Sequence, residues 1–264
     1  MKVPRPQIDR QDVRGDSRLR GRRRHGYETA RPEVQAHVPA SAQRILDLGC
    51  STGALGAALK ERQNALVVGV EADADYASAA QSQLDRVLVS DIETFLQDSI
   101  PGEAPFDCLI AADVLEHLVN PWGVLKQAVG LLDAGGTVVI SVPNVAEWGG
   151  IWRLLRTGRW PRDDEGVFDR THLRWFTLDD ALDLIRSADL RVTAVEPRYW
   201  QTGWRLIWRL LLARTPLHRF LAPQYIISAI KGPLLSAAGE SSAGQVERDA
   251  GAAEVDGGDG ASAE

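Results

Sequence analysis

An α/β fold with a mostly parallel sheet is predicted by two features of the sequence. Between residues 44 and 140, short apolar runs alternate with stretches of helical composition. These runs lack the alternation of apolar and polar residues that is typical of a sheet with one solvated face. Strands that are apolar on both faces and separated by helices indicate a parallel sheet covered by helices on both sides.

The expected elements follow one another regularly along this region. We expect strands at 44–48, 66–71, 87–89, 106–111 and 137–142. We expect helices at 53–62, 74–84 and 121–132. After residue 179 the sequence predicts a further helix, and then two late strands at 190–195 and 225–230. No helical crossover of the earlier kind is expected between these two strands.

Length and composition predict one folded domain with two extensions. The 264 residues suit a single α/β domain. The extensions have no hydrophobic periodicity, so we expect them to be disordered. The expected organisation is a basic leader over 1–26, a domain over 27–236 with a lid at about 146–177 and an aromatic insertion at about 198–222, and an acidic tail over 237–264.

Cysteine usage and hydropathy favour a cytoplasmic protein. Cys50 and Cys108 lie inside apolar runs, without the spacing of a disulfide framework or a zinc site. No apolar segment reaches the ~18–20 residues that span a bilayer, and the N-terminus lacks the apolar core of a signal peptide. Aspartates interrupt the basic leader and no aromatics interleave it. A solvated leader is therefore favoured over a nucleic-acid or lipid contact.

Polar residues gather where successive expected strands end. Ligands of doubly wound sheets bind beyond the carboxyl ends of the strands. The first strand runs into a turn whose glycines let the backbone approach a ligand and open a helix N-terminus towards it. The second ends in Glu71, placed to accept hydrogen bonds from ribose hydroxyls. The third is followed by Asp91, which can accept from an adenine amino group, and by the apolar Ile92.

At these residues the chain resembles the class I methyltransferases that bind S-adenosylmethionine. The family pattern of an acid, spaced glycines and a second acid is matched at Asp47, Gly49, Gly53 and Glu71. The resemblance covers roughly residues 27–231 and is greatest for the small-molecule branch, such as ubiquinone-pathway and methionine-pathway-like methyltransferases. It implies S-adenosylmethionine as cofactor and a Rossmann-like, doubly wound sheet of seven strands, mostly parallel with an antiparallel last strand.

The cofactor site that the resemblance implies can be assigned residue by residue. It comprises Asp47, Gly49, Cys50, Ser51, Gly53, Glu71, Asp91, Ile92 and Asp113. Ser51 departs from the family, which often has a middle glycine there. Serine is small, so we expect little loss, although the left-handed conformations open to the turn become fewer.

Two other classes of function are weighed against a methyltransferase. A nicotinamide-dependent oxidoreductase needs the pattern G-x-G-x-x-G, which meets Ser51 in either register. The carboxylate of Asp47 would also repel a pyrophosphate, but it suits a zwitterionic methionine moiety. The polar residues of the lid argue, weakly, against a module that binds the cofactor without catalysis.

Candidate catalytic residues lie in the lid and after the fourth strand. Methyl transfer is accelerated by holding acceptor and methyl in line, and an oxygen acceptor also benefits from a base. His172 is the first candidate base, with Asp169 orienting it, and His117 beside Glu116 is the second. A hydrogen-bonded structural histidine in a packed aromatic lid is the alternative for His172. These four residues could hold a metal, but no ligand spacing supports one, so a metal-free site is expected.

The methyl acceptor is expected to be a small or lipid-linked molecule, and the acceptor atom a hydroxyl oxygen. Sugar or quinone-like acceptors follow from the family resemblance alone. Residues 112–115 lack the proline-proline-aromatic turn of enzymes that methylate nucleobase amino groups, so no nucleic-acid partner is expected. Two Trp/Arg-rich stretches, at 148–160 and 204–212, suit a membrane interface or an apolar acceptor. Both are short, which favours a packed cap or a dimer contact.

Overall fold

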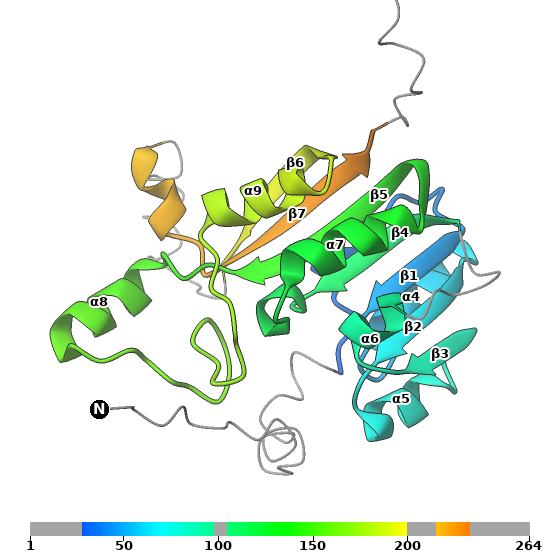
Figure 1. Ribbon diagram of the computed structural model, residues 1–264, viewed down its shortest axis with the longest axis horizontal. Helices are drawn as coiled ribbons and strands as arrows, with labels where there is room; N and C mark the ends of the chain where they lie inside the picture. The colour runs from blue at the N-terminus through cyan, green and yellow to red at the C-terminus, as the bar shows by residue number, and fades with distance from the viewer. Residues whose placement is uncertain (1–27, 98–104, 200–214, 233–264) are drawn as a thin grey trace, which may run out of the picture. The chain divides into compact units, whose positions relative to one another are not determined.

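The computed structural model in Figure 1 describes residues 28–97, 105–199 and 215–232. Seven strands of these residues form one sheet in the order β3-β2-β1-β4-β5-β7-β6. β3, β2, β1, β4 and β5 pair in parallel, whereas β7 is antiparallel to both β5 and β6. The α/β fold with an antiparallel last strand is thus confirmed. The expected leader and tail, and residues 200–214 of the expected insertion, lie outside the described residues.

The strands agree with the apolar runs of the sequence, apart from their ends. They are β1 (Arg44–Leu48), β2 (Leu66–Glu71), β3 (Arg86–Val89), β4 (Phe106–Ala112), β5 (Leu132–Pro143), β6 (Leu190–Arg198) and β7 (Gln224–Lys231). β5 begins five residues earlier than the expected 137. Gly135 has a φ of 80°, and the pairing register with β4 shifts next to it. The glycine therefore lies at an irregularity inside the strand.

Three of the helices were not expected from the apolar periodicity of the sequence. The helices are α3 (Pro32–Gln35), α4 (Ala54–Gln63), α5 (Ala74–Ala80), α6 (Ile92–Gln97), α7 (Pro121–Gly130), α8 (Trp148–Thr157) and α9 (Leu178–Ser187), with 3-10 turns η1 (Leu115–His117) and η2 (Pro216–Phe220). Those not expected as helices are α3, α6 and α8. α5 ends at Ala80, before the expected residue 84.

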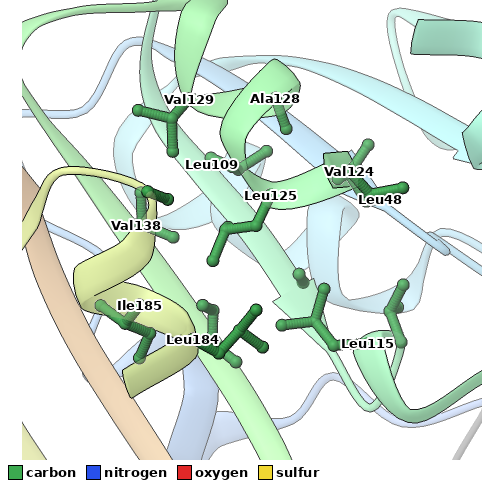
Figure 2. Close-up of a cluster of buried hydrophobic side chains, with 14 of the residues drawn as sticks. Leu48, Leu109, Leu115, Val124, Leu125, Ala128, Val129, Val138, Leu184 and Ile185 are labelled. Atoms are coloured by element: carbon green, nitrogen blue, oxygen red, sulfur yellow. The ribbon is translucent and has the colours of Figure 1, made fainter. Parts of the chain in front are cut away.

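Alternate residues of the strands bury into two apolar layers, one on each face of the sheet. Leu46 and Leu48 of β1 pack with residues of α6, α7 and α9, and Figure 2 shows the central part of this layer. Ile45 of the same strand packs with residues of α3, α4 and α5. α7 and α9 lie side by side over the sheet in Figure 1. The two-sided cover explains why the strands are apolar throughout.

The described residues contain no helix that is both long enough and apolar enough to cross a membrane. α8 follows β5 and lies beyond the end of the sheet in Figure 1. The chain then returns towards the sheet, where Phe176 forms a bridge with Asn144. The expected lid is therefore a helix followed by an irregular segment, with both its ends beside the carboxyl end of β5.

Candidate active site

The turn between β1 and α4 is built from three residues with left-handed backbone. Gly49, Ser51 and Gly53 have φ values of 72°, 50° and 82°. A Cβ atom at Gly49 would lie 2.7 Å from Cγ2 of Val114, so only glycine fits this position without a shift. Ser51 adopts the left-handed conformation that a middle glycine would reach freely, at a cost of roughly 1–2 kcal/mol.

Asp47, at the penultimate position of β1, is a buried carboxylate with an unsatisfied oxygen. Asp47 is 2% exposed, and its Oδ2 has no hydrogen-bond partner among the residues that the structure describes. Burial, and then the negative charge of Glu71, raise the pKa of Asp47 to about 7, while Arg31 acts in the opposite direction. An orphaned buried acceptor of this kind suits a cationic ligand group, such as the amino group of a methionine moiety.

Glu71 links the glycine turn to the start of α5. Its Oε2 accepts from the backbone N–H of Ser51 at 2.9 Å, and its Oε1 accepts from that of Asp73 at 2.8 Å. Burial raises the pKa of Glu71, and these backbone donors lower it. Each carboxylate oxygen has a second lone pair, so both can still accept from a ribose hydroxyl. Glu71 therefore both shapes the turn and keeps acceptor capacity beside it.

Three other residues of the expected cofactor set have mainly structural contacts. Cys50 is buried, and a Cβ atom at Gly69 would lie only 2.5 Å from its Sγ, so the thiol packs against β2. Asp91 accepts from the backbone N–H of Glu93 at 3.0 Å at the start of α6. Ile92 is buried in the layer that α6 covers. Of these three, only Asp91 presents a polar side-chain group at a strand end.

Asp113 follows β4 with a φ of 58° and connects distant parts of the chain. Its Oδ2 lies 2.9 Å from Nη1 of Arg31. Its Oδ1 accepts from Oγ of Ser141 at 2.8 Å and from Nε2 of Gln224 at 2.6 Å. The N-terminal segment, β5 and β7 thus meet at one carboxylate. Sequence reasoning missed Arg31, and no pattern around this single arginine marks it.

Glu116, His117 and His172 form a second cluster beside the same end of β4. One potential ligand atom from each of these residues lies within 4.8 Å of the others. Glu116 is 1% exposed, and its Oε2 has no partner among the residues that the structure describes. Burial, and then the negative charge of Asp113, raise the pKa of Glu116 well above its ordinary value. The fold therefore brings together residues whose spacing in the sequence does not resemble that of metal ligands.

Backbone and side-chain contacts orient both histidine rings of this cluster. Nδ1 of His172 lies 3.0 Å from the carbonyl oxygen of Val167, and its Nε2 lies 4.0 Å from Oε1 of Glu116. Nδ1 of His117 lies 3.3 Å from the carbonyl oxygen of Thr171. The two rings meet edge to face, with centroids 4.8 Å apart. His172 is buried, whereas His117 is partly exposed.

Asp169 acts on this cluster through a neighbouring hydroxyl. Its Oδ1 accepts from both the backbone N–H and the Oγ1 of Thr171, at 2.8 and 2.6 Å. Oγ1 of Thr171 in turn lies 3.3 Å from Nδ1 of His117. These bonds connect Asp169 to His117, the second candidate base. The lid is also fixed to η1, because the N–H groups of Leu173 and Arg174 both donate to the Glu116 carbonyl.

Comparison with known proteins finds curated relatives that share one name. A ubiquinone biosynthesis O-methyltransferase of Stutzerimonas stutzeri (strain A1501) is 28% identical over 114 residues, which are 42% of this chain and 49% of the relative. A second one, from Xylella fastidiosa (strain 9a5c), is 30% identical over 114 residues, 42% of this chain and 46% of the relative. The chain spans about half the length of the curated relatives it matches.

Solved structures share the fold at low identity. A possible histamine N-methyltransferase of Thermotoga maritima, described as S-adenosylmethionine-dependent, has a TM-score of 0.58 at 16% identity and covers 84% of this chain and 98% of its own. The plantazolicin methyltransferase BpumL, solved with a desmethylPZN analog and SAH, has a TM-score of 0.57 at 14% identity, covering 84% and 94%. At these identities the structures show the fold alone.

The curated relatives are named as methyltransferases, and solved S-adenosylmethionine-dependent methyltransferases share the fold of this chain. The two sets of residues described above, at the glycine turn and after β4, lie at the end of the sheet where such enzymes hold their ligands. One family model covers most of the domain, from residue 30 to residue 218, and it describes the methionine biosynthesis protein MetW. The chain belongs to the MetW family.

Proposed function

We propose that this protein binds S-adenosylmethionine at the turn after β1 and transfers its methyl group to a hydroxyl oxygen of a small or lipid-linked acceptor. The observation that carries the proposal is the orphaned, buried carboxylate of Asp47 beside the left-handed glycine turn. The curated relatives are named as O-methyltransferases, which favours an oxygen acceptor.

The cofactor would be held by residues at three strand ends. Asp47 would face the positively charged methionine moiety, Glu71 would accept from the ribose hydroxyls, and Asp91 would accept from the adenine amino group. When bound, S-adenosylmethionine supplies an electrophilic methyl group on a sulfonium, and its carbon–sulfur bond breaks as the new bond to the acceptor forms. Asp113, tied to Arg31, would fix the backbone between this site and η1.

The acceptor would bind beside the histidine pair after β4. His172 is the first candidate for the group that takes the hydroxyl proton, because its Nδ1 points to a carbonyl oxygen and its Nε2 faces Glu116. His117 is the second candidate, with Asp169 and Thr171 holding its ring. Arg170 and Arg174 of the lid are engaged elsewhere, since Arg170 pairs with Asp164 and Arg174 donates to the carbonyl of Val119.

Calorimetric titration with S-adenosylmethionine, S-adenosylhomocysteine and NAD tests the cofactor. We expect micromolar binding of the first two, weakened at least about tenfold in Asp47→Asn, because the variant removes a buried charge facing a cation. Lys126→Met, which changes an exposed charge on α7, serves as the matched control and keeps full affinity. Binding of NAD alone would establish the oxidoreductase alternative, and binding without any turnover of acceptors would leave the non-catalytic module.

A peripheral lipid contact is a further part of the proposal, because α8 exposes an apolar face. Trp148 and Trp152 are both more than half exposed and stack with ring centroids 6.3 Å apart, and Leu155 is 68% exposed. Aromatic and basic residues on one short helix suit the boundary of a lipid layer. We expect the protein to float with anionic vesicles and Trp152→Ser to abolish this, while Val89→Ser, at another exposed apolar residue, has no effect.

A further inference from the structure

We propose that Glu116, His117 and His172 form a binding site for a divalent transition-metal ion of the zinc type. The three residues offer one carboxylate oxygen and two imidazole nitrogens, all within 4.8 Å of one another. Two histidines with one glutamate form the protein ligand set of several catalytic zinc sites, and two histidines with one carboxylate hold non-haem iron. This proposal departs from the metal-free site that the sequence predicted.

The unsatisfied oxygen of Glu116 is the independent observation that points to a ligand. The side chain is 1% exposed, and its Oε2 has no hydrogen-bond partner within the described residues. A buried carboxylate oxygen without a partner carries a free-energy cost, because it has lost its hydrogen bonds to water and gained none in the fold. A bound cation would offset this cost, because it neutralises the charge and occupies the lone pair.

The orientation of the histidines agrees with metal ligation. A metal-bound histidine usually donates its second ring N–H to a carbonyl or carboxylate, which fixes the tautomer. Nδ1 of His172 lies 3.0 Å from the carbonyl of Val167, so a donor there puts the lone pair on Nε2, the atom that faces Glu116. Nδ1 of His117 lies 3.3 Å from the carbonyl of Thr171 in the same way. Both rings therefore present Nε2 as the ligand.

The dimensions of the cluster require a small contraction around the ion. Tetrahedral zinc with bonds of about 2.0–2.2 Å places its ligand atoms roughly 3.3–3.6 Å apart. Oε1 of Glu116 and Nε2 of His172 are 4.0 Å apart, so these atoms would approach by about 0.5 Å, and a pair at the 4.8 Å limit of the cluster would approach by about 1.2–1.5 Å. His117 is partly exposed and gives the ion a path from solvent.

Three protein ligands leave at least one coordination position open. An oxygen of the acceptor could occupy this position and lose its proton to solvent more easily there, as water does on catalytic zinc. In that case both histidines act as metal ligands, and neither takes the hydroxyl proton as a base. This consequence rests on the proposed function, whereas the metal site itself does not. Nitrogen donors disfavour Mg²⁺, which prefers oxygen ligands. We therefore expect Zn²⁺ and Co²⁺ to bind much more tightly than Mg²⁺.

The test is metal binding by the chelator-treated full-length protein, measured without cofactor or acceptor. We expect Zn²⁺ and Co²⁺ to bind with one equivalent in calorimetry, and Co²⁺ to give a visible absorption band of a low-symmetry site. His172→Ala and Glu116→Gln should each weaken binding by more than about 100-fold, beyond the 10–100-fold loss typical of an outer-shell partner. His218→Ala, a histidine on η2 outside the cluster, should bind as wild type.

Several outcomes would overturn the site. They are absence of Zn²⁺ binding, preference for Mg²⁺, and undiminished binding in both cluster variants. Thermal unfolding of each variant without metal, together with its affinity for S-adenosylmethionine, shows whether the domain remains folded. Because the metal is measured alone and the cofactor is measured with metal chelated, failure of this site and failure of the proposed methyltransferase activity give different results.

Discussion

The carboxyl group of Asp47 makes the stability of the ligand-free protein depend on pH. Its pKa is raised from 3.8 in the unfolded chain to about 7 by burial and by Glu71. The contribution of this group to the free energy of unfolding is therefore fully present below about pH 4 and is lost as pH rises through 7. We expect the free energy of unfolding to fall between pH 5 and 8 by more in the wild type than in Asp47→Asn. Urea unfolding of both proteins across this range measures the difference, and equal slopes would contradict it.

A methyl group at Gly49 should damage the glycine turn. Alanine there would need a φ of 72°, and its Cβ would lie 2.7 Å from Val114. We expect Gly49→Ala to lower the free energy of unfolding by about 1–3 kcal/mol and to weaken binding of S-adenosylmethionine. Ser51→Gly is the matched control, because it relieves left-handed backbone in the same turn and should stay within about 1 kcal/mol of the wild type. Denaturant titration with and without cofactor compares the two.

The positions of candidate residues could be predicted from the sequence where a residue lies at the end of a strand. Asp47 and Glu71 lie at the ends of apolar runs, and the parallel pairing of β1 and β2 brings such ends together. Arg31 and Thr171 could not be found in this way, since their roles depend on contacts made across the fold. The proximity of His117 and His172 is of the same kind, because 54 residues separate them and only the return of the lid joins them.

At the scale of elements, the capping box of α9 offers a measurable contribution. The Thr177 side chain accepts from the N–H of Asp180, whose carboxylate in turn accepts from the N–H and Oγ1 of Thr177. We expect Thr177→Ala to cost about 1 kcal/mol of unfolding free energy, because it leaves a helix N–H without its acceptor. Arg186→Ala on the same helix removes only an exposed pair and should cost less than about 0.5 kcal/mol. Equal losses in the two variants would refute the cap.

Elements were predictable to the extent that apolar periodicity defines them. Helices such as α7 and α9 bury a stripe of residues against the sheet, and this stripe is visible in the sequence. α8 buries only Gly150, so its apolar residues do not pack on the sheet. The sequence alone could not show whether this stretch packs as a cap or stays exposed. The early start of β5 was missed because residues 133–135 are exposed and interrupt the apolar run that marks the rest of the strand.

At the scale of the whole domain, Arg31 connects the N-terminal segment to the sheet. Its guanidinium pairs with Asp113 at 2.9 Å, and the same carboxylate accepts from β5 and β7. Arg31→Met leaves a partly buried carboxylate without its cation, so we expect a loss of about 1–3 kcal/mol in urea unfolding. Lys126→Met, at an exposed site on α7, should be close to neutral. An unchanged free energy of unfolding in Arg31→Met would mean that the pair of Arg31 with Asp113 contributes no stability.

The short turn after β4 has a consequence for how acceptors could diversify in this family. Asp113 and His117 are four residues apart, so the groups proposed to face the cofactor and those proposed to face the acceptor both follow the carboxyl end of β4. On the proposed function, the sheet would therefore set the distance between the methyl donor and the acceptor. The surface that would select the acceptor comes from the lid, which touches this turn through a few backbone bonds. New acceptor preferences can therefore arise by exchanging lid residues, while the geometry of methyl donation stays unchanged.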